Sequence, residues 1–197
     1  MTLADAVVDL VGTFGRDGDR GRLALTDGPA SGSARTASDA GGGGTTASEL
    51  EDYLDALDVE PGTAIGGVLA LELAGRDDLP RLQEGRAVVH VHGQPRADTS
   101  WPASWVVIAL SGESVVAVDT SSPACPVRGA VGGSYLPLAD CLADWLSAVA
   151  VVMRLEQEHG EGVRDADLNL APAFLDDARA ALLPVLGEDC LDGFTEL

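Results

Sequence analysis

The chain contains no lysine, so all 12 of its basic residues are arginines, and 32 aspartates and glutamates leave a formal net charge of −20. A surface this acidic repels nucleic-acid phosphates and anionic membranes and attracts basic proteins. The same bias also accompanies a GC-rich genome or adaptation to high salt. We therefore expect no nucleic-acid partner and no membrane partner, and we favour a basic protein partner.

Cysteine is scarce, and long apolar runs are missing. The three cysteines are Cys125, Cys141 and Cys190. An odd number without a CxxC pair argues against a disulfide framework or a zinc finger and suits a reducing cytoplasm. The longest apolar run, residues 148–153, is well short of the roughly 20 residues that span a bilayer. The N-terminus carries Asp5 and Asp9 instead of the basic region of a signal peptide, so we expect a cytoplasmic protein.

Aromatic residues make up only 4% of the chain although 46% is hydrophobic, so valine, leucine and alanine must fill the core. Residues 27–48 are rich in Gly, Ser, Thr and Ala, with four consecutive glycines and no periodicity, which predicts a flexible linker. This stretch lacks the Gly-Lys-Ser/Thr ending of a phosphate loop. We divide the chain into an N-terminal helical segment (1–26), the linker (27–48) and a single domain (49–197).

Hydrophobic spacing predicts a mixture of helices and strands. Helices are expected at residues 1–15, 49–57, 137–155 and 172–183, and strands at residues 87–92, 105–110, 115–119 and 127–131. The turn Ser111-Gly112-Glu113 joins the second and third strands into an antiparallel hairpin. Residues 65–73 are apolar and favour a buried helix over a strand.

The helix ends carry their own signals. Ser48 and Glu51 have the spacing of a capping box at the start of the helix at 49–57. Pro137 suits the first turn of the third helix, and Pro184 and Gly187 are expected to end the last one. Trp145 lies on the apolar stripe of the third helix, which predicts a core position.

The histidines give little support to a metal site. His90 and His92 occupy positions i and i+2 of an expected strand, so their side chains would share one face. A metal site needs a third ligand of definable position, and the remaining His159 is far away in the sequence. We expect half-exposed strand histidines and no metal.

No residue stands out as an activated nucleophile. Cys141 lies near the start of its expected helix, beside core-facing Leu142, which favours a plain buried thiol over a thiolate. Ser111-Gly112 lacks the GxSxG pattern of a serine hydrolase. Asp119 ends a strand, as active-site carboxylates often do, but the Thr-Ser-Ser that follows favours a turn. We predict no catalytic residues and no cofactor; the alternative is a small enzyme that uses Asp119 and the His90/His92 face.

Two tryptophans flank the loop before the hairpin. We expect one of Trp101 and Trp105 to lie in the core and the other to be partly exposed, where tryptophan often anchors a partner. Acidic residues near the hairpin would steer a basic partner toward it. The predicted partner-binding residues are Asp98, Trp101, Glu113 and Asp119.

The same region resembles the SUKH superfamily. Members commonly show a Trp-led apolar strand, a short Gly-containing turn, a strand that ends in Asp, a Pro-Val segment and a closing amphipathic helix. Here these elements read Trp105-Val-Val-Ile-Ala, Ser111-Gly112-Glu113, Val115-Val-Ala-Val-Asp119, Pro126-Val127 and Leu138 through Leu146.

The resemblance implies an α+β fold with a central, mainly antiparallel sheet flanked by helices. It also implies a function, because many bacterial members resemble immunity proteins that neutralise a cognate toxin. On that basis we expect a non-enzymatic domain that occludes the active site of a basic toxin. A regulatory scaffold protein of the same fold, without a toxin partner, is a further alternative.

Overall fold

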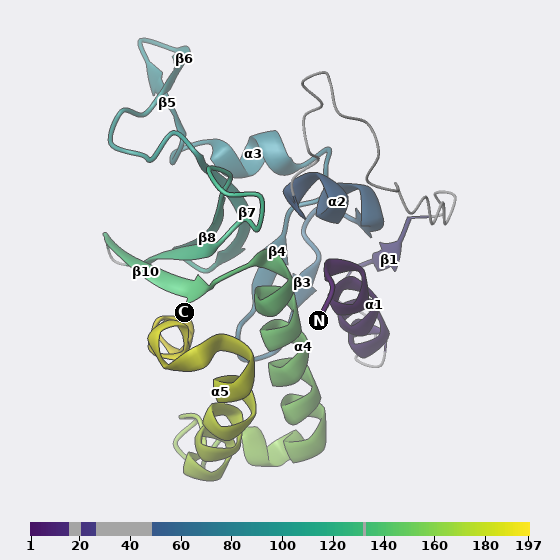
Figure 1. The fold of residues 1–197 in the computed structure, drawn as a ribbon. Helices are drawn as coiled ribbons and strands as arrows, with labels where there is room; N and C mark the ends of the chain where they lie inside the picture. The colour runs from purple at the N-terminus through teal and green to yellow at the C-terminus, as the bar shows by residue number, and fades with distance from the viewer. Residues whose placement is uncertain (16–20, 27–48, 132) are drawn as a thin grey trace.

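The centre of the protein is a six-stranded antiparallel sheet with the order β10-β9-β8-β7-β4-β3 (Figure 1). The structure is a computed structural model that describes residues 1–15, 21–26, 49–131 and 133–197. The central strands are β3 (Ala64–Ile65), β4 (Leu71–Leu73), β7 (Trp105–Ser111), β8 (Ser114–Asp119), β9 (Val127–Val131) and β10 (Ser134–Ala139). The helices are α1 (Leu3–Phe14), α2 (Glu49–Ala56), α3 (Leu79–Gln83), α4 (Leu142–His159), the 3₁₀ turn η1 (Gly160–Val163) and α5 (Pro172–Thr195).

This arrangement is the α+β architecture that we predicted, an antiparallel sheet with flanking helices. Two small two-stranded antiparallel sheets complete it: β1 (Leu23–Leu25) with β2 (Leu57–Val59), and the hairpin of β5 (Val88–Val91) with β6 (Gln94–Ala97). The predicted linker at 27–48, with the cap at Ser48, lies outside the described residues.

The hairpin of β7 and β8 is confirmed. Trp105 pairs with Asp119 at one end of the ladder, and Ser111 pairs with Ser114 at the other. Gly112, in the two-residue turn, has φ of 56°, a left-handed conformation that glycine adopts without steric cost. Beyond the end of β4, the Gln83 side chain binds the backbone of β7 in place of a neighbouring strand. Its amide nitrogen donates to the Val107 carbonyl at 2.9 Å, and its oxygen accepts the Val107 N–H at 3.0 Å.

The expected helix at 65–73 is wrong. Gly66 has φ of 70° and Ala70 has φ of 44°, which break a helix and build a turn between β3 and β4. Leu71 and Leu73 are buried while Glu72 between them is not, the two-residue period of a strand. The composition of Ala and Leu suggested a helix, but pairing with β7 decides the conformation.

The helix predicted at 137–155 is shifted. It begins at Leu142, with Cys141 as its N-cap, and continues to His159. Pro137 and Leu138 instead belong to β10, whose register with β9 shifts between Pro137 and Ala139. Leu138 is fully buried as predicted, but from a strand.

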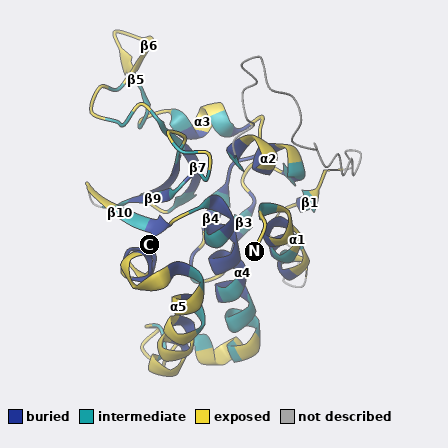
Figure 2. Ribbon diagram, in the orientation of Figure 1, coloured by how far each residue is buried: buried dark blue, intermediate teal, exposed yellow. Residues whose placement is uncertain are grey.

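One face of the sheet carries the main core. Alternate residues of the strands, including Ile108, Val116 and Val118, pack there against α4, and α1, α2 and α5 complete the layer. Trp145 of α4 is fully buried, which confirms its predicted position. Figure 2 shows α4 and the central strands as largely buried, in contrast to the exposed β5–β6 hairpin at the edge of the molecule.

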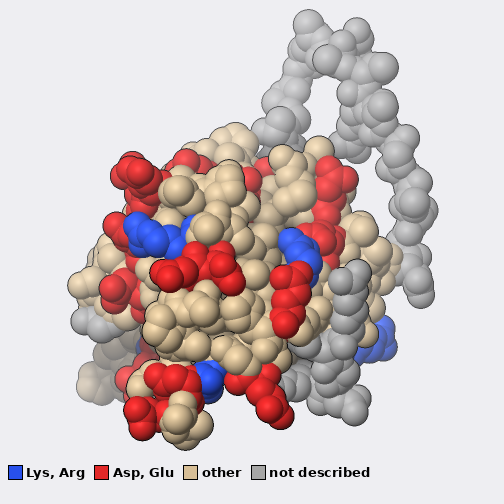
Figure 3. Space-filling view, turned by 90° about the horizontal axis from the view of Figure 1, so that it is seen from below, with Lys and Arg blue, Asp and Glu red and all other residues tan. Residues whose placement is uncertain are grey.

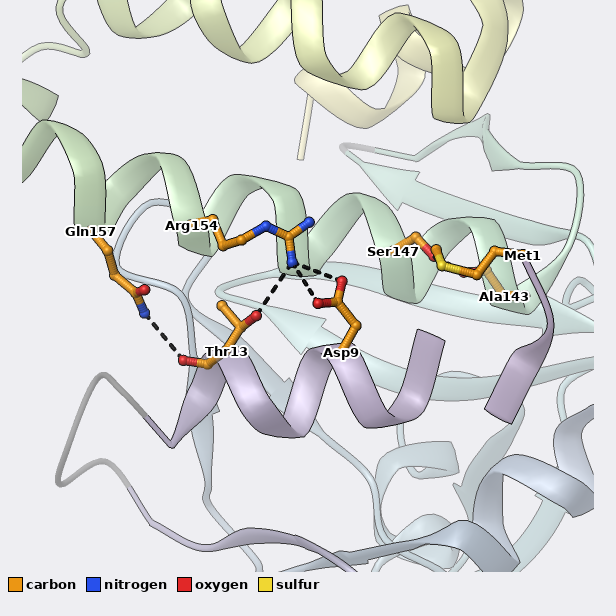
Figure 4. A network of polar contacts seen from close by, with 7 residues as sticks. All are labelled: Met1, Asp9, Thr13, Ala143, Ser147, Arg154 and Gln157. Atoms are coloured by element: carbon orange, nitrogen blue, oxygen red, sulfur yellow. Dashed lines mark hydrogen bonds and ion pairs between the residues drawn. The ribbon is translucent and has the colours of Figure 1, made fainter. Parts of the chain in front are cut away.

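Helix α1 packs along α4 and shares this core through Ala6, Val7 and Leu10. Polar contacts line the seam between the two helices (Figure 4). Arg154 donates to both carboxylate oxygens of Asp9 at 2.8 and 2.7 Å.

The C-terminal helix α5 supports the β10 edge of the sheet. The helix continues past Pro184, contrary to our prediction, but it breaks at Gly187, as predicted; φ there is 72°, and a second helical stretch follows to Thr195. After this break, Gly193 lies directly against the backbone of β10. A methyl group on Gly193 would overlap the carbonyl oxygen of Pro137, so only glycine allows this close approach.

Candidate functional site

Three aromatic rings meet on the second face of the sheet, the one that α4 does not cover. Trp101 and Trp105 lie 5.9 Å apart between ring centroids, Trp101 and Tyr135 lie 6.3 Å apart, and Trp105 and Tyr135 lie 4.8 Å apart. All three pairs are edge-on. We call Trp101, Trp105 and Tyr135 the aromatic cluster; it uses three of the chain's eight aromatic residues (three Trp, two Tyr and three Phe).

The curl of the sheet brings the cluster together. Trp105 begins β7 and Tyr135 lies in β10, three strand spacings away, which is roughly 14 Å in a flat sheet. Their short ring separation therefore requires the sheet to curl toward this face, as the curved strands in Figure 1 show. The residues of β8 and β9 on this face include the small Ala117 and Ala130, which leave room for the rings, and also Arg128, which pairs with Ala117.

A second, small hydrophobic cluster supports the rings from below. Val107, Val115, Leu82 and Ala74 are buried there, and Trp101 packs against them. Trp101 and Trp105 are both half-buried, so the prediction that one would be a core residue is wrong. Tyr135 is 51% exposed, and its hydroxyl makes no hydrogen bond within the described residues.

Hydrogen bonds fix the orientation of the two indoles. The Trp101 indole N–H donates to the Trp105 carbonyl at 3.0 Å. Hydrogen bonds from Ser121 and Ser104, with a further one from the Trp105 indole, lower the pKa of Asp119. The Ser121 backbone N–H contributes to this set at 3.0 Å. Asp119 is thus a turn residue, as its sequence context favoured, and it also holds a ring of the cluster.

The four predicted partner-binding residues lie at both ends of the β7–β8 ladder. Asp98 is joined to the cluster, because its carbonyl accepts the Trp101 backbone N–H at 3.2 Å and its carboxylate caps Ser100. Trp101 and Asp119 belong to the same region. Glu113 lies in the turn at the opposite end of the β7–β8 ladder, where Arg86 approaches its carbonyl. Residues at both ends of the hairpin are near it in the sequence, so the sequence alone does not tell the two ends apart.

Tyr135 was missed by the sequence analysis. It follows the glycine-rich end of β9 in a segment that we left without an assignment, and it pairs with Ala130. The signal that could have found it is the rarity of aromatic residues, since an exposed tyrosine in such a chain is conspicuous. Only the curl of the sheet shows that it joins the two tryptophans.

The residues considered for chemistry are dispersed. His90 lies in the exposed β5, while His92 lies in the turn after it, with φ of 53°, so the pair does not share a strand face as predicted. Neither histidine is among the hydrogen-bond partners of Asp119 within the described residues. The structure has no group of three or more His, Cys, Asp or Glu side chains, over the residues it describes, that could hold a metal ion.

The cysteine thiols lie in different places. Cys141 accepts the backbone N–H of Asp144 through its sulfur at 3.4 Å, which makes it the N-cap of α4. Burial raises the pKa of Cys141 to about 11, so this thiol stays protonated at neutral pH. Burial also raises the pKa of Cys190. A protonated thiol is a poor nucleophile.

A cavity of about 500 Å³ lies away from all the predicted site residues, between the end of α1, the Gly66–Gly67 turn and the end of α4. The Glu156 carboxylate forms part of its wall and accepts the backbone N–H groups of Gly67 at 2.6 Å and Val68 at 2.7 Å. These bonds tie the β3–β4 turn to α4, which gives Glu156 a structural role.

Acidic side chains predominate over basic ones on the face seen in Figure 3. Several of the arginines are engaged in ion pairs, such as Arg76 with Glu51 at 3.0 Å and Asp55 at 2.7 Å. Arg81 likewise pairs with Asp78 and Glu72. The excess negative charge therefore remains on the surface, while much of the positive charge is neutralised locally.

No model of a known protein family matches the chain, and no curated protein or solved structure matches it. No helix in the described part of the chain is long and apolar enough to cross a membrane.

Proposed function

We propose that this protein is a non-enzymatic binding domain that captures a basic protein through its aromatic cluster. The observation that carries the proposal is the cluster itself: a half-exposed group of two tryptophans and a tyrosine on the open face of the sheet. Aromatic residues of this kind dominate the binding energy of many protein interfaces. In a chain with so few aromatics, their concentration on the surface favours binding over packing.

The charge supports a basic partner. The net charge of −20 would attract a positively charged protein over a distance and raise the rate of encounter. In this proposal the acidic surface accelerates association, and the aromatic cluster holds the complex. Asp98, beside the cluster, contributes to the local negative potential.

The cellular role that fits best is that of a cytoplasmic immunity protein of the SUKH type, which occludes the active site of a toxin. Nucleases that bind phosphates present basic active sites, and an acidic inhibitor complements them. The sequence resemblance between Trp105 and Leu146 and the α+β fold are consistent with this role. A small enzyme built on Asp119 gains no support, since the hydrogen bonds of that carboxylate are all made to neighbouring residues.

The test is a series of association rates between this protein and the product of the gene adjacent to its own, at increasing salt concentration. We expect the association rate constant to fall steeply as salt screens the attraction, with a much smaller change in the dissociation rate constant. Binding that is independent of salt would contradict electrostatic steering. No binding to that product would contradict the immunity role.

A further inference from the structure

The polar atoms of the aromatic cluster are largely used within the protein. The Trp101 indole N–H is bound to the Trp105 carbonyl, and the Trp105 indole interacts with Asp119. The hydrogen bond of Trp101 leaves its indole N–H unavailable to a partner. What the two tryptophans can offer is therefore their ring surface.

Asp119 is also engaged. Asp119 accepts the Ser121 backbone N–H at 3.0 Å, and the Ser121, Ser104 and Trp105 side chains beside it lower its pKa. It is poorly placed to form a new bidentate salt bridge. Its negative charge, however, lies beside the Trp105 indole and attracts a cation to the rings.

We propose that the aromatic cluster recognises the guanidinium group of an arginine side chain by stacking and cation–π attraction. This inference rests on the proposed function and names the chemical group that the basic partner presents. A guanidinium is planar, stays charged and is weakly hydrated, so it stacks on aromatic rings more readily than an ammonium group. The net charge of −20 attracts cations to the protein as a whole, and beside the rings the carboxylates of Asp98 and Asp119 outnumber the one guanidinium, that of Arg128.

The test uses a small probe and the intact protein. N-acetyl-arginine methylamide is titrated into protein labelled with ¹⁵N, and the three tryptophan indole N–H resonances are followed by NMR. Trp101 and Trp105 are expected to shift, whereas Trp145, fully buried on the other side of the sheet, serves as an internal control. The citrulline analogue has nearly the same shape without the charge and is expected to cause little shift.

Two variants complete the test. Tyr135→Ala removes the exposed ring and is expected to weaken binding of the arginine probe roughly threefold, and Tyr135→Phe, which keeps the ring, is expected to bind within about twofold of the original protein. Equal shifts with the arginine and citrulline probes, or no shift up to the solubility limit, would overturn the inference.

The outcome is distinguishable from failure of the proposed function. If the adjacent gene product binds but the arginine probe does not, the guanidinium inference is wrong and the binding role stands. If the arginine probe binds selectively but the adjacent gene product does not, the immunity role is wrong and the recognition site stands.

Discussion

The two faces of the six-stranded sheet differ in how they are covered. One face packs against α4, with α1, α2 and α5 around it, and holds the main core. The other is covered only in part, by the short helix α3 and by the segment that carries Trp101; it holds a much smaller buried cluster and leaves Tyr135 exposed. Trp145 is buried at the first face, whereas Trp101, Trp105 and Tyr135 are partly exposed at the second. Aromatic rings thus stabilise the fold on one side and form the proposed binding surface on the other.

The largest expected loss of stability comes from a substitution on the covered face. Trp145→Ala should lower the free energy of unfolding by about 3–5 kcal/mol, because it removes a large, fully buried side chain and leaves a cavity. The measurement is chemical denaturation. Trp145→Phe is the matched control and should cost much less, because it keeps a ring and removes an indole N–H that has no hydrogen-bond partner in the described residues. An unfolding midpoint unchanged by Trp145→Ala would contradict the assignment of this face as the core.

Substitutions of two glycines by alanine test how closely α5 packs against β10 on the covered side of the sheet. Gly193→Ala should destabilise the protein by about 1–3 kcal/mol, because the added methyl group overlaps the backbone of Pro137. Gly12→Ala in α1 meets no atom within 4 Å and should stabilise by about 0.5–1 kcal/mol, since alanine is the better helix former. Thermal unfolding of both variants measures the difference. Equal stabilisation by the two substitutions would mean that α5 does not press against β10.

A smaller effect is expected from charges at the two ends of the β7–β8 hairpin. Asp98→Asn keeps an acceptor for Ser100 but removes the negative charge beside the aromatic cluster, and should slow association with the basic partner by about twofold. Glu113→Gln removes a charge at the other end and should have less effect. Stopped-flow association at low salt compares them. A larger effect of Glu113→Gln would move the binding surface toward the turn.

The hairpin and its turn could be predicted from the sequence because local patterns determine them. The apolar runs at 105–110 and 115–119 and the intervening glycine specify strands and a tight turn without reference to the rest of the chain. The turn at Asp119 was recognised for the same reason. The buried stripe of α4 around Trp145 was also predictable, because helical spacing is a local property.

Other features depend on contacts that are distant in sequence. Leu138 lies at helical spacing from Leu142, yet pairing with β9 makes its segment a strand. The Leu71 segment becomes a strand because β7 offers an unpaired edge. Only part of the candidate site could be predicted from the sequence, for a similar reason. Trp101 and Asp98 are near each other in the sequence, whereas Tyr135 reaches them only through the curl of the sheet. Glu113 and Asp119 are both near the hairpin in sequence, and only the strand pairing shows that they lie at opposite ends of its ladder.

The central claim, that the exposed ring of the aromatic cluster binds a partner and contributes little to stability, is tested most directly by Tyr135→Ala. Leu175→Ala is the matched control, because Leu175 is 47% exposed on the first turn of α5, on the covered side. Unfolding free energy and affinity for the adjacent gene product are measured for both variants. We predict that each loses less than about 1 kcal/mol of stability and that only Tyr135→Ala weakens binding, by about tenfold or more. A loss of several kcal/mol in Tyr135→Ala, or an affinity unchanged from that of the original protein, would contradict the account.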